Sequence, residues 1–175
     1  MKQLQVAELI HRYRDIGHLL SCLDPLAACP QPVDGTSLYL SRQGGFCFLA
    51  PTGYTLDEIV RIVRVAVSAG LIHVRLTGGE PLVRRGIVDL VAQLAAIPGL
   101  EDLSMTTNGM LLERYAGELA QAGLRRINLS LDTLRPERFH NITRLGNLEQ
   151  VLRGRETALE AGLRPVKVNT VVVRG

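Results

Sequence analysis

Four residues that could bind a charged ligand lie in short apolar runs of the sequence: Arg75, Thr106, Ser130 and Lys167. Arginine and lysine bind phosphate and carboxylate groups through charge-assisted hydrogen bonds, and a hydroxyl group both donates and accepts. Each of these residues taken alone also has a purely structural explanation. If the fold brings them together, two cations at one site would suit a ligand that carries phosphate groups.

A glycine pair follows the run that contains Arg75, in the segment Thr77-Gly78-Gly79-Glu80-Pro81. Glycines allow backbone amides to approach a ligand closely. A ligand with both an ammonium and a carboxylate group suits this segment, because Glu80 would pair with the ammonium group while the glycine amides bind the acid. A plain turn into the next helix is the alternative.

The two following runs end in Thr106-Thr107-Asn108-Gly109 and in Ser130-Leu131-Asp132. Gly109 can be read as a turn glycine and Asp132 as the cap of the following helix. The same segments place polar groups at the carboxyl ends of predicted parallel strands, which is where ligands bind in α/β folds. The sequence leaves both readings open.

The elements that must position these residues are marked by four Gly-Leu pairs, at residues 70–71, 99–100, 123–124 and 162–163. A glycine can adopt the left-handed conformation that ends a helix, and the leucine after it packs back onto the last turn. A strand-like run follows each pair, and residues 55–58 match a helix capping box. The pattern predicts strands over 72–77, 102–107, 125–131 and 166–173, a further first strand over 36–40, and helices from 55, over 83–97, over 111–122 and around 148–159, with a helical turn near Pro136.

Each of these four strand-like runs alternates apolar and polar residues. Because successive side chains of a strand point to opposite faces, Val74 and Leu76 share one face and Arg75 lies on the other. All four candidate ligand residues fall on the polar face. A doubly wound sheet buries both faces, so we expect an α/β fold that is a wide or incomplete barrel, with helices outside and a polar lumen. An α/β sheet with one solvated face is the alternative.

Composition excludes several classes of protein. The chain has 175 residues with 46% hydrophobic residues and a formal net charge of +3, which is too small an excess to indicate nucleic-acid or membrane binding. The longest run without a charged residue, Gln43–Leu56, is too short for a transmembrane helix. No secretory signal is recognisable, and a cytoplasmic location is expected.

Residues from about 54 to 175 resemble the GTP 3′,8-cyclase family of molybdenum-cofactor (molybdopterin) biosynthesis, which are radical S-adenosylmethionine (SAM) enzymes. The order and the spacing of the matching stretches agree with that family: Val74–Arg85, Leu103–Gly109, Arg126–Asp132 and Val166–Val172. The resemblance implies an α/β fold that is a partial TIM-like barrel of the radical SAM type, truncated after about five strands, and a lyase activity. It also implies that a [4Fe-4S] cluster cleaves SAM to a radical, which removes a hydrogen atom from the ribose of GTP before the sugar closes onto the guanine ring.

The resemblance also assigns residues to two ligands. It implies that GTP is bound by Arg75, Thr106 and Lys167. It implies that SAM is bound by Gly78, Gly79, Glu80 and Ser130.

The cysteines depart from the family pattern. The family binds its cluster with three thiolates in a CxxxCxxC loop after the first barrel strand, but Cys22, Cys29 and Cys47 do not have that spacing. We therefore assign no cluster ligands, although the three thiols could still converge in space. Three readings stay open: an active enzyme, a catalytically silent module that binds SAM or a purine nucleotide, and a fragment that needs a partner chain to close its barrel.

The N-terminal segment has a different character. Residues 4–26 resemble the N-terminus of the 2-oxoglutarate dehydrogenase component and read as an amphipathic helix. Residues 27–35 contain Pro30, Pro32 and Gly35 and read as a linker. We therefore expect an N-terminal helix and linker over 1–35 and the partial barrel over 36–175.

Overall fold

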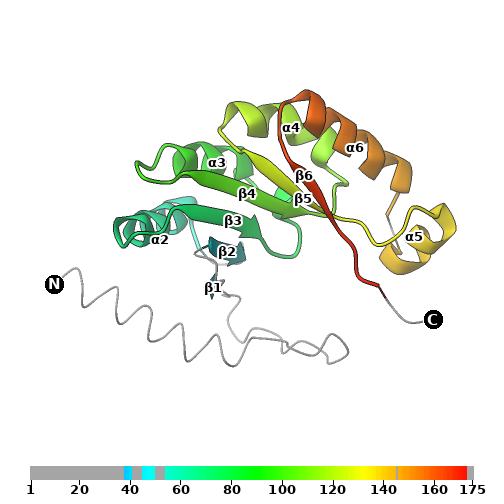
Figure 1. The fold of residues 1–175 in the computed structure, drawn as a ribbon, viewed down its shortest axis with the longest axis horizontal. Helices are drawn as coiled ribbons and strands as arrows, with labels where there is room; N and C mark the ends of the chain where they lie inside the picture. The colour runs from blue at the N-terminus through cyan, green and yellow to red at the C-terminus, as the bar shows by residue number, and fades with distance from the viewer. Residues whose placement is uncertain (1–37, 41–44, 50–53, 145, 173–175) are drawn as a thin grey trace.

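The computed structural model describes residues 38–40, 45–49, 54–144 and 146–172, and Figure 1 shows its fold. The expected N-terminal helix and linker lie outside the described residues, so the boundary between 35 and 36 stays a prediction. No helix in the described part of the chain has the length and apolar composition to cross a membrane. The elements in chain order are β1 (Leu38–Leu40), β2 (Gly45–Leu49), α2 (Leu56–Ser68), β3 (His73–Thr77), the 3₁₀ turn η1 (Pro81–Val83), α3 (Ile87–Ala95), β4 (Asp102–Thr107), α4 (Leu112–Gln121), β5 (Arg126–Ser130), α5 (Pro136–Thr143), α6 (Leu148–Glu160) and β6 (Val166–Asn169).

The described strands form one sheet in the order β1-β2-β3-β4-β5-β6. Each neighbouring pair from β2 to β6 is parallel. The spatial order of the strands thus follows their order in the sequence, as in a βα barrel. In a doubly wound sheet, by contrast, the strand order reverses at a switch point, where successive strands are added to the other edge of the sheet. The α/β partial barrel expected from the sequence is confirmed, with β1 and β6 at the two edges of the described sheet.

The first expected strand has a different role from the one the sequence suggested. Residues 38–40 do form β1, but β1 pairs antiparallel with β2. A parallel pair needs a crossover of a dozen or more residues, and only residues 41–44 connect these two strands. β2 is therefore the first strand of the parallel series.

One face of the sheet is buried under helices. α3, α4 and α6 lie along it in Figure 1, and residues of α2 belong to the same core. In β3, β4 and β5, five of the strand residues predicted to be apolar and inward are between 0% and 3% exposed: Val74, Leu76, Met105, Ile127 and Leu129. Burial of this one face selects the register, because a slip of one residue would place the polar set in the core.

The predicted capping box begins α2. Thr55 Oγ1 accepts a hydrogen bond from the Glu58 amide at 3.3 Å, and the Thr55 amide donates to Glu58 Oε2 at 2.8 Å. Hydrogen bonds from the backbone and side chain of Thr55 lower the pKa of the Glu58 carboxyl from its usual value of 4.5. The charged carboxylate therefore satisfies amide groups that the first helical turn leaves without partners.

Two predicted elements differ from the observed ones. The helix expected over 83–97 begins only at Ile87, because Gly86 has φ 76° and separates α3 from η1. The strand expected over 166–173 ends at Asn169. Val168, predicted to be inward, is 48% exposed, because no described helix follows β6 to cover it.

Helices α4 and α6 approach each other closely at Gly154 of α6. A Cβ atom at this position would lie 2.9 Å from the Gly109 carbonyl oxygen and 3.1 Å from the Glu113 amide nitrogen. Both neighbours are backbone atoms, which cannot move aside as a flexible side chain can. The contact therefore depends on glycine.

We predict that Gly154→Ala destabilises the protein by about 2 kcal/mol or more, since the added methyl group forces α6 away from the loop after β4. Urea unfolding followed by circular dichroism measures the change. Gly117→Ala in α4 is the matched control, because a Cβ there meets nothing within 4 Å. The control should raise stability by up to about 1 kcal/mol, as expected for Gly→Ala in a helix. Equal effects of the two substitutions would contradict the close packing.

Candidate functional site

The hydrogen-bonded register collects the predicted ligand residues on one face of the sheet. Thr106 of β4 pairs with Asn128 of β5, which pairs with Lys167 of β6. Thr106 and Lys167 are therefore two strand spacings apart, or about 10 Å between backbones. The register thus brings two of the three residues that the family resemblance assigns to GTP to either side of Asn128.

Arg75 lies on the same face in the neighbouring row. It pairs with Ser104, which pairs with Arg126. Arg75 and Lys167 are both exposed, and neither has an ion-pair partner within residues 54–144 and 146–172. Two cations without a described counter-charge favour an anionic ligand on this face.

A separate ion pair neutralises the opposite end of the polar face. Arg126 Nη2 donates to Asp102 Oδ2, and both side chains are partly buried. This pair links β5 to β4 near the amino ends of the strands. Because its charges compensate each other, the uncompensated positive charge of the face comes from Arg75 and Lys167.

Glu80 connects the loop after β3 to the loop after β4. Its Oε1 accepts a hydrogen bond from Thr107 Oγ1 at 2.7 Å and from the Leu82 amide at 3.1 Å. Its Oε2 accepts from the Asn108 amide at 2.7 Å. Thr107 Oγ1 in turn accepts from the Gly109 amide at 3.0 Å. The carboxylate thus fixes both loops at the carboxyl ends of the strands, where ligands bind in this architecture.

These contacts change the role expected for Glu80. A carboxylate has about four positions for accepting hydrogen bonds, and donors of this chain fill three of them. The Glu80 carboxylate therefore positions the two loops, and direct pairing with a ligand's ammonium group stays a prediction. Thr107 is a residue that the sequence reasoning missed: by strand parity it faces the core, and it is 2% exposed, yet its hydroxyl group reaches Glu80.

The glycine pair leaves room for a ligand beside Glu80. Gly78 has φ 154°, a conformation that side chains rarely allow. Gly79 is exposed, and a Cβ atom built on it would meet nothing within 4 Å in the described structure. Local packing therefore does not demand glycine at position 79. An open approach to the backbone does fit the ligand-binding role that the sequence suggested for Gly78 and Gly79.

A cavity of about 240 Å³ adjoins Ser130 at the end of β5. Asn108 and Asp132 line it together with Phe139 of α5. Asp132 does not cap α5, as one reading of the sequence had it, because α5 begins after Arg135. Instead Asp132 Oδ1 accepts a hydrogen bond from the Val171 amide at 2.8 Å and joins the end of β5 to the segment after β6.

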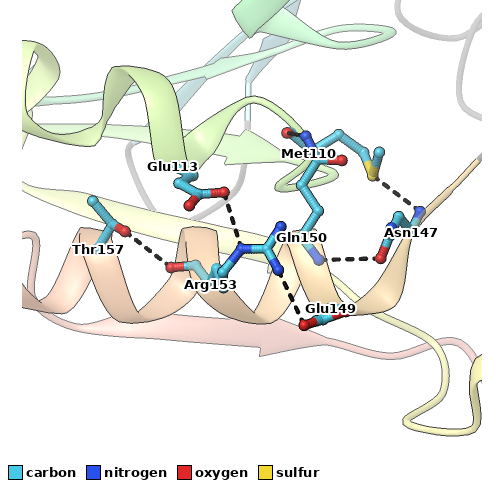
Figure 2. A network of polar contacts seen from close by, with 7 residues as sticks. All are labelled: Met110, Glu113, Asn147, Glu149, Gln150, Arg153 and Thr157. Atoms are coloured by element: carbon cyan, nitrogen blue, oxygen red, sulfur yellow. Dashed lines mark hydrogen bonds and ion pairs between the residues drawn. The ribbon is translucent and has the colours of Figure 1, made fainter.

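Met110 lines this cavity and contacts residues at the start of α6, and Figure 2 shows these contacts. Gln150 Nε2 donates to the Met110 carbonyl oxygen at 2.8 Å, and the Asn147 amide lies 3.4 Å from Met110 Sδ. One turn further along α6, Arg153 contacts Glu113 of α4 at 3.3 Å. These contacts join α6 to the loop after β4, in addition to the hydrogen bonds that this loop makes to Glu80.

The described residues do not supply the ligands of an iron-sulfur cluster. No three His, Cys, Asp or Glu residues among them lie close enough together to hold a metal ion. Cys22 and Cys29 lie outside the described residues, and Cys47 is in β2. The described donor set does not fit a [4Fe-4S] cluster.

The fold defines an α/β protein of the βα-barrel class, with a candidate ligand site at the carboxyl ends of its parallel strands. The family model of the radical SAM superfamily matches residues 48–175, and the chain belongs to this superfamily. Membership implies SAM and a [4Fe-4S] cluster as cofactors, in agreement with the expectation from the sequence. For SAM, the open backbone at Gly79 fits the implied ligand; for the cluster, the described residues do not.

The chain is similar to bacterial proteins named GTP 3′,8-cyclase. It is 51% identical to the protein of Alkaliphilus metalliredigens over 121 residues, which are 69% of this chain and 38% of that protein. It is 55% identical to the protein of Moorella thermoacetica over 120 residues, with 69% and 37% covered. GTP 3′,8-cyclase 1 of Pseudomonas aeruginosa is 56% identical over 121 residues, with 69% and 37% covered. The chain thus spans a little over a third of the length of these relatives.

The resemblance of residues 4–26 to 2-oxoglutarate dehydrogenase has no support in these comparisons. These residues precede the matched region and lie outside the described structure. The assignments of individual residues to GTP and SAM stay predictions.

We predict that Glu80→Gln and Thr107→Val each lower the free energy of unfolding by about 1–3 kcal/mol, because each leaves a buried hydrogen-bonding group without its partner. Urea unfolding measures the change. Thr106→Val is the matched control, since the Thr106 side chain makes no hydrogen bond to a described residue, and it should stay within about 0.5 kcal/mol of the parent. If Thr106→Val lowers the free energy of unfolding as much as Thr107→Val does, the hydrogen bond between Thr107 and Glu80 does not hold the two loops together.

Proposed function

We propose that this chain provides the barrel part of a GTP 3′,8-cyclase of molybdenum-cofactor biosynthesis, with binding sites for GTP and SAM. The observation that carries the proposal is the register of the polar face, which gathers Arg75, Thr106 and Lys167 beneath the loops that hold Gly79 and Glu80. Identity above 50% to proteins of that name supports it. The reaction is a cyclisation of GTP, as the names of those relatives state.

In this proposal Arg75 and Lys167 bind the phosphate groups of GTP, and Thr106 donates a hydrogen bond from its hydroxyl group. A polyphosphate chain needs donors and positive charge, and these three residues provide both. The exposed backbone at Gly78 and Gly79 lies against SAM. Glu80 keeps that backbone and the Asn108 amide at a fixed separation, and Ser130 borders the cavity beside them.

We further propose that the chain alone binds its ligands without catalysing the cyclisation. SAM and a reduced cluster together supply the radical in this superfamily, and the described residues contribute no cluster ligands. A fragment or a silent binding module is therefore favoured over an independent lyase. A cytoplasmic location and the division of the chain at residue 35 also remain proposals.

A partner chain that supplies the next strand and helix of the barrel forms the last part of this proposal. The side of the sheet beyond β6 is apolar: Leu134, Leu152 and Val168 line a groove of about 620 Å³. Leu134 is 69% exposed. Strands β3, β4 and β5 bury apolar residues in the core that they share with the described helices, and the relative from Alkaliphilus metalliredigens is nearly twice the length of this chain. The groove is suited to an amphipathic helix of the same fold.

We predict that Arg75→Ala or Lys167→Ala weakens GTP binding by about 10- to 100-fold, because each removes a charge-assisted hydrogen bond worth about 1.5–3 kcal/mol. SAM binding should change by less than about twofold. Isothermal titration calorimetry with each ligand measures both. Arg61→Ala, on the exposed side of α2, is the matched control for loss of one positive charge. Equal losses for both ligands, or no loss for either, would contradict the assigned roles.

We predict that anaerobic reconstitution with iron and sulfide yields no stable cluster in the isolated chain. Iron analysis and a visible absorption spectrum, recorded with and without SAM, measure the outcome. A relative that has the cluster motif, treated in parallel, shows that the procedure works. A cluster near one per chain that responds to SAM would mean that Cys22, Cys29 and Cys47 converge, and the proposal of a catalytically silent chain would be wrong.

A further inference from the structure

Asn128 occupies the centre of the polar face and has no role in the site as assigned so far. It lies on β5 between Thr106 and Lys167 in the hydrogen-bonded register. Its side chain is only 5% exposed. Asparagine has no ionisable group, so its presence in a sequence does not indicate a binding site. Here it lies between Thr106 and Lys167, which the family resemblance assigns to GTP.

The carboxamide of Asn128 makes no hydrogen bond to any other residue of the described structure. Neither polar atom of this carboxamide is among the described side-chain atoms that are fully buried without a partner, so both stay accessible to a ligand. The other buried polar residues of the strands do have partners: Ser104 Oγ donates to the Val74 carbonyl oxygen at 3.4 Å, and Thr107 Oγ1 donates to Glu80. Asn128 is thus the exception within this set of described residues.

The charges around Asn128 indicate which partner it takes. Lys167 lies beside it on β6, and Arg126 and Arg75 occupy the next row of the same face. Arg126 is paired with Asp102, whereas Lys167 and Arg75 have no described counter-charge. A group bound here meets positive charge and the Asn128 donor together, which suits a phosphate oxygen, because such an oxygen only accepts hydrogen bonds.

We propose that Asn128 binds the polyphosphate chain of the nucleotide, with its Nδ2 donating to a phosphate oxygen next to Lys167. This inference rests on the proposed function, since it assumes that the polar face binds GTP. Asn128 on β5 adds a neutral donor between Arg75 on β3 and Lys167 on β6. One phosphate group cannot contact both cations, because two further strands separate β3 from β6. Asn128 therefore fixes the position of the chain of phosphates along the row, rather than adding charge.

The test compares Asn128→Ala with Ser104→Ala, a matched control that removes another buried polar side chain from the same face. Calorimetric titration with GTP and with inorganic tripolyphosphate gives the affinities, and titration with SAM and urea unfolding report on the fold. We expect Asn128→Ala to weaken GTP and tripolyphosphate binding by about 5- to 20-fold each, with SAM affinity within twofold of the parent. Ser104→Ala should leave all three affinities within about twofold, because its hydroxyl group bonds to the backbone.

A second variant keeps the shape of the side chain. Asn128→Asp has nearly the same volume but places a negative charge beside the bound phosphates, so GTP affinity should fall further than with alanine, by about 50-fold or more. Asn128→Asp that binds GTP as well as the parent would overturn the inference. So would a loss in Asn128→Ala that affects GTP but not tripolyphosphate, since the contact would then be to the nucleoside.

The parent chain and Lys167→Ala separate this inference from the proposed function. If the parent binds neither GTP nor tripolyphosphate, the proposed function fails and the role of Asn128 fails with it. If Lys167→Ala loses GTP affinity as predicted while Asn128→Ala does not, the proposed function stands and the inference about Asn128 alone is wrong.

Discussion

The alternation of apolar and polar side chains along the parallel strands is the constraint on which the rest of the structure depends. Leu76, Met105 and Leu129 can be buried together only if the strands keep one register. In that register the opposite face must carry Arg75, Asn128 and Lys167. The hydrophobic effect acts on the covered face alone, yet it also sets the positions of the groups on the polar face.

A second level of organisation operates at the carboxyl ends of the strands. Loops there lack the ladder of hydrogen bonds that orders a sheet, so another interaction has to hold them. The Glu80 carboxylate does so by accepting hydrogen bonds from donors in the loops after β3 and β4, and Gln150 of α6 donates to the Met110 carbonyl oxygen. The loop after β4 is thus fixed by two sets of contacts, while a Cβ atom at Gly79 in the loop after β3 would meet nothing within 4 Å.

Membership of the superfamily implies SAM and an iron-sulfur cluster as cofactors. In our proposal the polar face binds the phosphorylated nucleotide, and Gly78, Gly79 and Ser130 lie against SAM. The described residues provide no metal-binding cluster. Val168 lies on the apolar side of β6 and remains 48% exposed, and it lines the groove together with Leu134 and Leu152.

The sequence by itself determined the fold class, the positions of β3, β4 and β5, and the polarity of the two faces, whereas β2 was not predicted and β6 is shorter than predicted. Strand parity and helix caps are local properties, so Val74–Leu76 and the capping box at Thr55 could be read directly from residue order. The family motifs added candidate roles for Arg75, Thr106 and Lys167. The start of α3 after Gly86 could not be predicted, because a single glycine within an apolar pattern is compatible with a continuous helix over 83–97.

Only the tertiary structure decided which distant groups meet. Thr107 looks like a core residue in sequence, and its bond to Glu80 arises because two parallel strands end at the same level. Asp132 does not cap α5; its carboxylate instead accepts a hydrogen bond from the Val171 amide in the segment after β6. The central place of Asn128 follows from the registers of β4, β5 and β6 together. Such pairings depend on long-range registry between strands, which residue order alone does not encode.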